Sequence, residues 1–194
     1  MATTQPIWNY LTARFSSRTQ PRRTASELYG RVVAQSREPW FYGDLGVPDT
    51  PEGRLEMVLL HVTLVLHRLK AEGSAVEPVA RALAEAFVTD MDDCLREMGV
   101  GDMTVAKKVK KAAAALFDRT RDYEHALASP TDDALGGLMT THLVGAANVS
   151  AAGRLAAYAR TSSDRLAGLD GAALQAGVLE FAPFAASSPW SPSP

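Results

Sequence analysis

The sequence has little of several residue types on which function is often built. Its 194 residues include one cysteine, Cys94, which excludes an internal disulfide framework and a cysteine-rich zinc module. The 20 basic residues nearly balance the 22 acidic ones, so a net charge of −2 gives no global field that attracts nucleic acid. In the apolar central region the longest uncharged run, residues 57–67, is far shorter than the roughly 20 apolar residues of a membrane span. We therefore expect one domain that does not cross a bilayer.

Catalytic and metal-binding motifs are also missing. The sequence contains no phosphate-binding glycine loop, nucleophile elbow, kinase motif set or zinc-ligand spacing, and its four histidines form no metal-ligand pair. Asp90, Asp93 and Glu97 share one helical face, but no second ligand motif accompanies them. A solvated or paired acidic face is the commoner interpretation of such a group. We predict a protein that is not an enzyme, with no catalytic, cofactor or metal site.

What the sequence does contain is helical periodicity with signals for helix starts and ends. Capping-box patterns at 24–27 and 74–77 indicate two starts, and Asp49-Thr50-Pro51-Glu52 indicates a third. The spacing of apolar residues predicts helices over 24–37, 51–72, 77–98, 102–127, 132–147 and 150–167, followed by a short helical turn and an extended end within 169–181. The predicted fold class is therefore all-α.

The domain organisation follows from charge and composition. We expect a single multi-helix domain over 24–182, between a flexible basic arm over 1–23 and a disordered Pro/Ser-rich tail over 183–194. The arm has no acidic residue, and its apolar residues fall at helical spacing with arginines beside them. It is therefore expected to bind an anionic membrane surface through Trp8, Leu11, Arg14, Phe15 and Arg18. Alternatively, this segment packs on its own domain or is frayed.

The place of the protein in the cell is predicted from the same end of the chain. The amino terminus lacks the continuous apolar segment and cleavage site of a secretory signal. Its composition also suits a mitochondrial transit peptide, but the abundance of alanine and arginine over the whole chain favours a bacterial protein. We expect a cytoplasmic protein associated peripherally with the inner membrane, or alternatively one on the matrix face of the mitochondrial inner membrane.

Three groups of residues are candidate contacts for a partner. Segment 39–48 is apolar without helical periodicity, and its aromatics Trp40, Phe41 and Tyr42 either cover the helical core or form a binding surface. On helix 51–72, residues seven apart form a line that either contacts an acidic partner or pairs with a neighbouring helix: Arg54, His61 and Arg68. A third group is a basic patch that is either solvated or binds phosphate, lipid headgroups or an acidic partner: Lys107, Lys108, Lys110 and Lys111.

Several separated motifs, in order, resemble the ubiquinol-cytochrome c chaperone family. They are LYGRVVAQSR at 28–37, FYGDLGVPDT at 41–50, Gly53-Arg54, His61, DMDDCLREMGVGD at 90–102 and Lys107-Lys108. The resemblance covers residues 27–127 strongly and 130–182 loosely. It implies an all-helical, non-enzymatic assembly factor for respiratory complex III that holds newly made cytochrome b. Mitochondrial members of the family work with a small helical partner and at the ribosome, and ribosome contact is expected here from the resemblance alone.

We combine these observations in one hypothesis: the aromatic segment lines an apolar groove, and the basic residues of the other two groups form its charged rim. No specific nucleic acid is predicted as a partner, because no aromatic platform accompanies the lysines. The alternative from a different class is a helical lipid- or quinone-binding module at the membrane surface. A regulatory RNA-binding role is the third hypothesis.

Overall fold

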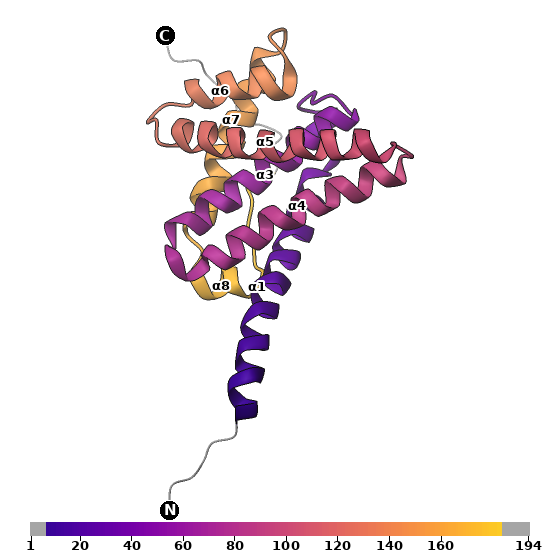
Figure 1. Cartoon of the computed structure of the whole chain (residues 1–194). Coiled ribbons are helices and arrows are strands. Elements are labelled where there is room, and N and C mark those ends of the chain that lie inside the picture. Colours follow the sequence, from indigo (N-terminus) through magenta and orange to yellow (C-terminus); the bar gives the residue numbers. More distant parts are fainter. Residues whose placement is uncertain (1–6, 184–194) are drawn as a thin grey trace, which may run out of the picture.

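The computed structural model describes residues 7–183, and side chains from residue 20 onward. Regular secondary structure in this part of the chain is entirely helical, which confirms the predicted fold class (Figure 1). In order, the elements are α1 (Ile7–Ser36), α2 (Pro39–Gly43), α3 (Pro51–Ala71), the 3₁₀ turn η1 (Ser74–Val76), α4 (Glu77–Glu97), α5 (Asp102–Leu127), α6 (Asp133–Met139), the π-helical turn η2 (Thr140–Val144), α7 (Val149–Ala167) and α8 (Gly171–Gln175).

Helix α3 forms the centre of the fold and packs against α1, α4, α5 and α7. Local signals define its ends as predicted: the Thr50 side chain accepts a hydrogen bond from Gly53 N–H at 3.1 Å, and Gly73 follows the helix with a φ of 82°. Apolar residues point to both of its sides, and those that are fully covered include Met57, Leu59, Leu60, Val62, Leu64, Val65 and Leu69. Burial of this kind makes α3 the central helix, against which the four other long helices pack.

Helix α1 corrects the prediction at the amino end. A helix was expected to start at the capping box of residues 24–27, but α1 runs without interruption from Ile7 through Pro21 to Ser36. Thr24 is buried, and its hydroxyl donates to Gln175 O at 2.9 Å instead of capping a helix. The predicted boundary between arm and domain therefore falls inside a helix. The arm side chains Trp8, Leu11, Arg14, Phe15 and Arg18 lie outside the described side chains, as the tail 184–194 lies outside the described residues.

The starts of α4 and α5 agree with the predicted ranges, but the capping box predicted at 74–77 does not form. The box at 74–77 forms the turn η1, and α4 then begins at Glu77 with Pro78 in its first turn and no side-chain cap. Helix α5 begins at Asp102, whose carboxylate accepts a hydrogen bond from Arg96 at 2.6 Å. Met98, the last residue of the range predicted for α4, follows that helix and is 60% exposed.

The carboxyl-terminal part closes the core. The helix predicted over 132–147 is shorter and ends in the π-helical turn η2, after which Asn148 caps α7 by accepting from Ala151 N–H at 3.3 Å. A short helix and an extended end within 169–181 are confirmed as α8 and residues 178–183. In this extended end, Ala182 N–H donates to the Ser162 hydroxyl at 3.0 Å, so the segment is attached to α7.

Candidate functional site

The candidate residues do not form one groove, because α3 separates them. At about 100° per residue, Lys70 lies about half a turn from His61 around the helix axis. His61 faces Tyr158 of α7, whereas on the opposite side Lys70 pairs with Glu124 of α5 at 2.7 Å. Glu56 also faces α5 and accepts two hydrogen bonds from Arg119, at 2.9 and 3.0 Å. The aromatic segment and the lysines of α5 therefore lie on opposite sides of the central helix.

On the α7 side, five rings form a buried aromatic cluster around His61. It joins α2, α3, α7 and the extended end, and consists of Trp40, Phe41, His61, Tyr158 and Phe181. The ring centroids of Phe41 and Tyr158 lie 5.1 Å apart, and those of His61 and Phe181 5.0 Å apart, both in edge-to-face geometry. Phe41 and His61 are fully buried. Phe41 thus covers the core, which is the first of the two interpretations given for the aromatic segment; the second is a binding surface.

Both ring nitrogens of His61 are occupied. Nδ1 lies 2.7 Å from Met57 O, a carbonyl that can only accept, so Nδ1 carries the proton and donates. Nε2 then accepts from the Tyr158 hydroxyl at 2.6 Å. Burial lowers the pKa of His61 from 6.5 to about 4 and raises the pKa of Tyr158. His61 is therefore neutral at pH 7 and acts as a structural hydrogen-bonding group of the core.

At the edge of this cluster, Trp40, Tyr42 and Arg54 form an aromatic corner. Trp40 and Tyr42 are partly buried, and the Tyr42 hydroxyl donates to Ser36 O at 2.6 Å. The guanidinium of Arg54 lies 5.3 Å from the centre of the Tyr42 ring, and its Nε donates to Asp49 at 2.6 Å. Half of the Arg54 side chain remains exposed. The corner presents the Trp40 ring and the hydrogen-bonded Tyr42 ring next to an exposed ion pair.

Arg68, the third residue of the predicted line on α3, is a structural clamp. It is buried, and its guanidinium donates to Leu166 O at 2.7 Å, to Leu169 O at 2.5 Å and to Glu72. These carbonyls lie at the end of α7, where a helix leaves its last acceptors unpaired. Of the line Arg54, His61 and Arg68, only Arg54 is on the surface. The other two lie in the core and form no charged rim.

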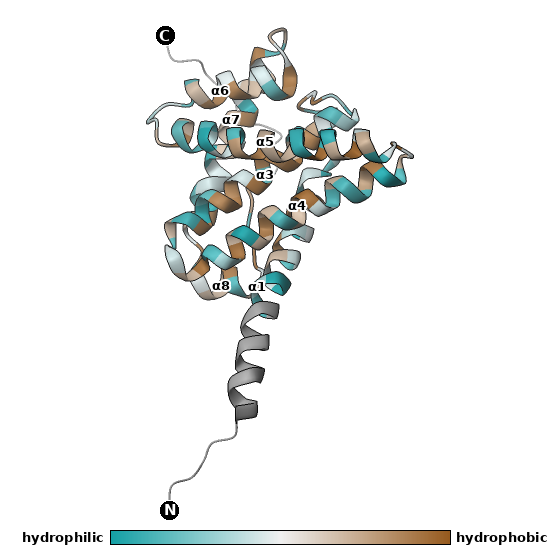
Figure 2. Ribbon diagram, viewed as in Figure 1, coloured by the Kyte–Doolittle hydropathy of each residue, from teal (hydrophilic) through white to brown (hydrophobic). Residues whose placement is uncertain are grey.

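The lysines stand on a second surface, the outer face of α5, which we define by Met103, Lys107, Lys110, Ala114 and Phe117. All five residues are exposed and lie within about 80° around the helix, opposite its buried residues Val105 and Leu116. Met103 is 92% exposed and Phe117 73%. Lys111 is exposed beside this face, and Lys108 is exposed further around the helix. Hydrophilic and hydrophobic residues alternate along α5 in Figure 2.

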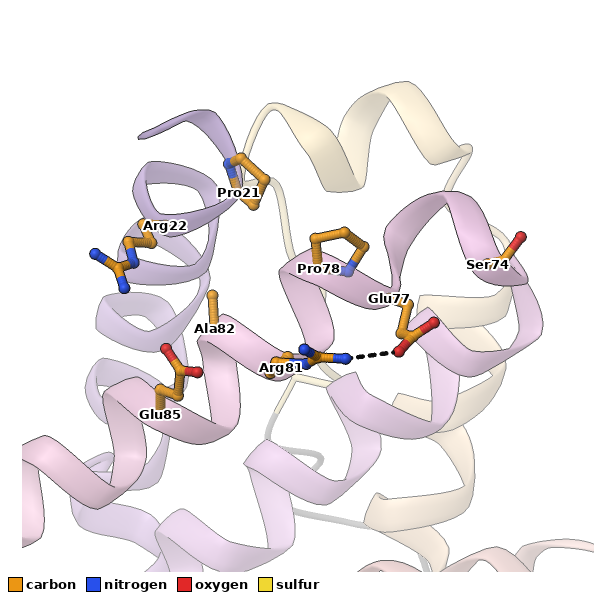
Figure 3. Close-up of a pocket in the computed structure, with 8 residues that line it drawn as sticks. All are labelled: Pro21, Arg22, Ser74, Glu77, Pro78, Arg81, Ala82 and Glu85. Atoms are coloured by element: carbon orange, nitrogen blue, oxygen red, sulfur yellow. Dashed lines mark hydrogen bonds and ion pairs between the residues drawn. The ribbon is translucent and has the colours of Figure 1, made fainter. Parts of the chain in front are cut away.

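A hollow of about 600 Å³ lies between α1 and α4, and none of the candidate residues is among those that line it (Figure 3). Four of its eight lining residues are charged, and two of these, Arg81 and Glu77, form an exposed ion pair at 2.9 Å. Ser74 carries the only hydroxyl among the lining residues, and the carboxylate of Glu77 is paired with Arg81.

Two carboxylates of α4 have hydrogen-bonding or ion-pair partners. The Asp90 carboxylate accepts from the Tyr29 hydroxyl at 2.7 Å, and Asp92 pairs with Arg96 at 2.5 Å. Among the described residues no group of three or more histidine, cysteine, aspartate or glutamate side chains is placed to hold a metal ion. Within the same part of the chain, no helix has both the length and the apolarity to cross a bilayer.

Comparison with known families identifies the chain. The family model described as ubiquinol-cytochrome C chaperone matches residues 43–181, which is more than half of the sequence. The chain belongs to the ubiquinol-cytochrome c chaperone family. The resemblance inferred from the separated motifs is thus confirmed, and the matched range includes α3 and the whole of α5, whereas Trp40 and Tyr42 of the aromatic corner lie just before it.

A solved structure agrees with this assignment. The crystal structure of the Cbp3 homolog from Brucella abortus matches with a TM-score of 0.78 and 33% sequence identity, covering 90% of this chain and 97% of that one. Comparison with curated protein sequences gave no match. Members of the ubiquinol-cytochrome c chaperone family are assembly chaperones of ubiquinol-cytochrome c reductase, and the chain shares their all-helical fold.

Sequence reasoning missed three residues that matter in this member of the chaperone family. Met103 and Phe117 are exposed apolar residues, and their positions opposite the buried residues of α5 were a readable signal. Arg160 joins α7 to the end of α5: it donates to Leu127 O at 3.0 Å and pairs with Asp132 at 2.5 Å. No local pattern distinguishes Arg160 from a surface arginine, because its acceptors are distant in sequence.

Proposed function

We propose that this chaperone binds newly made cytochrome b and holds it during assembly of the cytochrome bc1 complex. The observation that carries the proposal is membership of the ubiquinol-cytochrome c chaperone family, with a structural match along almost the entire chain. Cytochrome b offers a chaperone apolar helices joined by polar loops. Reversible binding of such a client requires an apolar surface bordered by charge.

The aromatic corner fits this requirement. Trp40 and Tyr42 offer partly exposed rings, while Arg54 and Asp49 provide a charged border. The corner is also rigid, because Phe41 anchors α2 in the core and the Tyr42 hydroxyl is bonded to Ser36 O. A rigid surface loses little conformational entropy when a client binds. We assign the client contact to this corner and not to Phe41, His61 or Arg68, which are buried.

The role is non-enzymatic in this proposal. His61, the most strongly perturbed histidine, has both ring nitrogens bonded and is fully buried, so neither nitrogen can exchange a proton with a bound client. Binding and release then depend on surface contacts alone. The client is a membrane protein, so we place the chaperone at the surface of the inner membrane.

The test is loss of the gene followed by complementation. A deletion strain is expected to contain much less cytochrome b and bc1 complex, measured by haem absorption and immunoblotting. Restoring the native chain recovers both, whereas Arg54→Glu is expected to reduce co-purification of cytochrome b about fivefold. Arg31→Glu, an equal charge change at an exposed position on α1, serves as the matched control.

Two results would overturn the proposal. Normal cytochrome b and bc1 levels in the deletion strain would remove the assembly role. Recovery of stoichiometric lipid or quinone from the purified chain, by organic extraction and mass spectrometry, would support a carrier instead of a protein chaperone.

A further inference from the structure

We propose that the outer face of α5 binds the anionic surface of a lipid membrane. The inference deepens the proposed function and rests on it for the location of the protein next to a bilayer. It assigns the membrane contact to Met103, Lys107, Lys110, Ala114 and Phe117, on the side of α3 opposite the aromatic corner.

The first argument is unneutralised positive charge. None of the four lysines 107, 108, 110 and 111 makes an ion pair within 4.0 Å in the described part of the chain. The nearest acids along α5 already have partners: Asp102 is paired with Arg96, and Asp118 and Asp122 are paired with Arg121. A cluster of ammonium groups without counter-charges attracts a surface rich in phosphate headgroups.

The second argument is the exposed apolar side chains in the same arc. Met103 and Phe117 are 14 residues apart, which places them about 21 Å apart along the helix with the lysines between them. Large apolar groups can enter the boundary of the acyl chains while lysine side chains extend to the phosphates. A lipid surface, which has both acyl chains and phosphates, therefore matches the apolar and the charged side chains of this face.

The shape favours a membrane over a peptide or RNA. The inward side of α5 packs on α3, α4 and α6, so its outward side is the convex ridge of one helix. A peptide is usually bound in a groove or along a sheet edge, whereas a convex ridge can lie on a plane. Single-stranded RNA is bound by several stacked aromatic rings, and Phe117 is the one aromatic residue of this face.

The face is also held in place before any partner binds. Arg119 is joined to Glu56 by two hydrogen bonds, and Glu124 to Lys70 by an ion pair, so α5 is attached to α3 on its inner side. Tyr123, which is fully buried, anchors the same turn of the helix. The outer face therefore needs no rearrangement to meet a flat surface.

The charge contribution is tested by co-sedimentation of the full chain with vesicles. We expect binding to vesicles of equal parts phosphatidylglycerol and phosphatidylcholine, weak binding to phosphatidylcholine alone, and loss of binding as salt rises. The double variant Lys107→Glu and Lys110→Glu is expected to bind about tenfold more weakly. Arg31→Glu with Arg165→Glu, the same charge change at exposed positions elsewhere, controls for net charge. Equal binding by the two double variants would overturn the proposal.

Insertion at the face itself is tested with a dye that reports polarity. In a Cys94→Ser background, the dye is attached at Phe117→Cys or, as control, at Val149→Cys, which replaces a valine that is 57% exposed at the start of α7. Anionic vesicles are expected to shift the emission at 117 to shorter wavelength and to leave 149 unchanged. This local readout separates the α5 face from any membrane contact by residues 1–23. No shift at 117 would overturn the proposal.

The proposed function is assayed separately, with cytochrome b in detergent and no vesicles. There the lysine double variant is expected to capture cytochrome b as the native chain does. Lost capture combined with retained vesicle binding would place the client on α5 and overturn the membrane assignment. Failure of the native chain to capture cytochrome b, with vesicle binding intact, would count only against the proposed function. Tight RNA binding without vesicle binding would replace lipid by RNA as the partner.

Discussion

The two sides of α3 differ in how their polar groups are satisfied. On the α7 side, His61 has partners for both ring nitrogens and Arg68 donates to two carbonyls and a carboxylate, all within the core. On the α5 side, the inner residues are equally well paired, but on the outer face of α5 Lys107 and Lys110 form no ion pair with any described residue, and Phe117 is exposed. The polar groups of the first region are satisfied within the fold, whereas the lysines of the second are exposed to solvent.

This difference shows that residue type and helical position do not decide whether a basic residue is buried or exposed. Arg68 and Lys107 both stand on helices with regular apolar periodicity, yet one is buried under the end of α7 and the other is exposed. Burial of a charge is tolerated only where hydrogen bonds replace its water. Exposed lysines next to exposed apolar groups have no such structural explanation, which is why we assign them to binding.

The largest expected effect is the contrast between two identical substitutions. Phe41→Ala opens a cavity in the aromatic cluster and is expected to lower the free energy of unfolding by about 3 to 5 kcal/mol. Phe117→Ala, on the outer face of α5, is expected to change it by less than about 0.5 kcal/mol. Urea unfolding followed by circular dichroism measures both. Similar losses for the two variants would contradict the distinction between core and contact surface.

Acid is expected to weaken the α7 side through His61. The unfolded chain binds a proton at this histidine near its ordinary pKa of 6.5, whereas the folded chain resists protonation until about pH 4. The free energy of unfolding therefore falls as pH drops through this window, by roughly 3 kcal/mol in total from this group. His61→Gln removes the titration and is expected to flatten the curve of stability against pH. Parallel curves for the variant and the native chain would show that other groups dominate.

A smaller loss is expected at the start of α3. A Cβ at Gly53 would lie 2.0 Å from Pro48 O, a backbone atom, so Gly53→Ala forces the segment before α3 to shift. We expect a cost of about 1 to 3 kcal/mol in the free energy of unfolding. Gly30→Ala, at an exposed position of α1 with free space around it, is the control and is expected to stabilise slightly. A cost at Gly30 equal to that at Gly53 would contradict the steric explanation.

The smallest effect concerns the lysines themselves. Lys107→Glu with Lys110→Glu breaks no ion pair in the described part of the chain and is expected to change the free energy of unfolding by less than about 0.5 kcal/mol. Thermal melts of the double variant and the native chain are compared directly. A loss well above this value would mean that the lysines stabilise the fold, and the two sides of α3 would then be less different than we describe.

Helix identity was predictable from the sequence where the signals are local. The Thr50 cap with Pro51 and the terminating Gly73 lie within a few residues of the backbone groups that they satisfy, so α3 was predicted with nearly its observed ends. The capping box at 24–27 has the same local form and was misleading. The Thr24 hydroxyl does not cap a helix, because it donates a hydrogen bond to Gln175 O, 151 residues away in the sequence.

The candidate site was predictable only in part. The shared direction of Arg54, His61 and Arg68 follows from seven-residue spacing, but the spacing does not reveal that α7 and the extended end cover two of the three. The exposure of Met103 and Phe117 was readable on a helical wheel, whereas the separation of the aromatic corner from the lysines depends on which faces of α3 meet α5 and α7.

By itself, the sequence determined the helical class, most helix positions and the family, since periodicity, caps and ordered motifs depend on residues that are close to one another in the chain. Tertiary structure alone decided which charges are buried and which are offered to a partner. The physical reason is that desolvation depends on what packs over a side chain, and at His61 the covering groups come from residues about a hundred positions later in the chain.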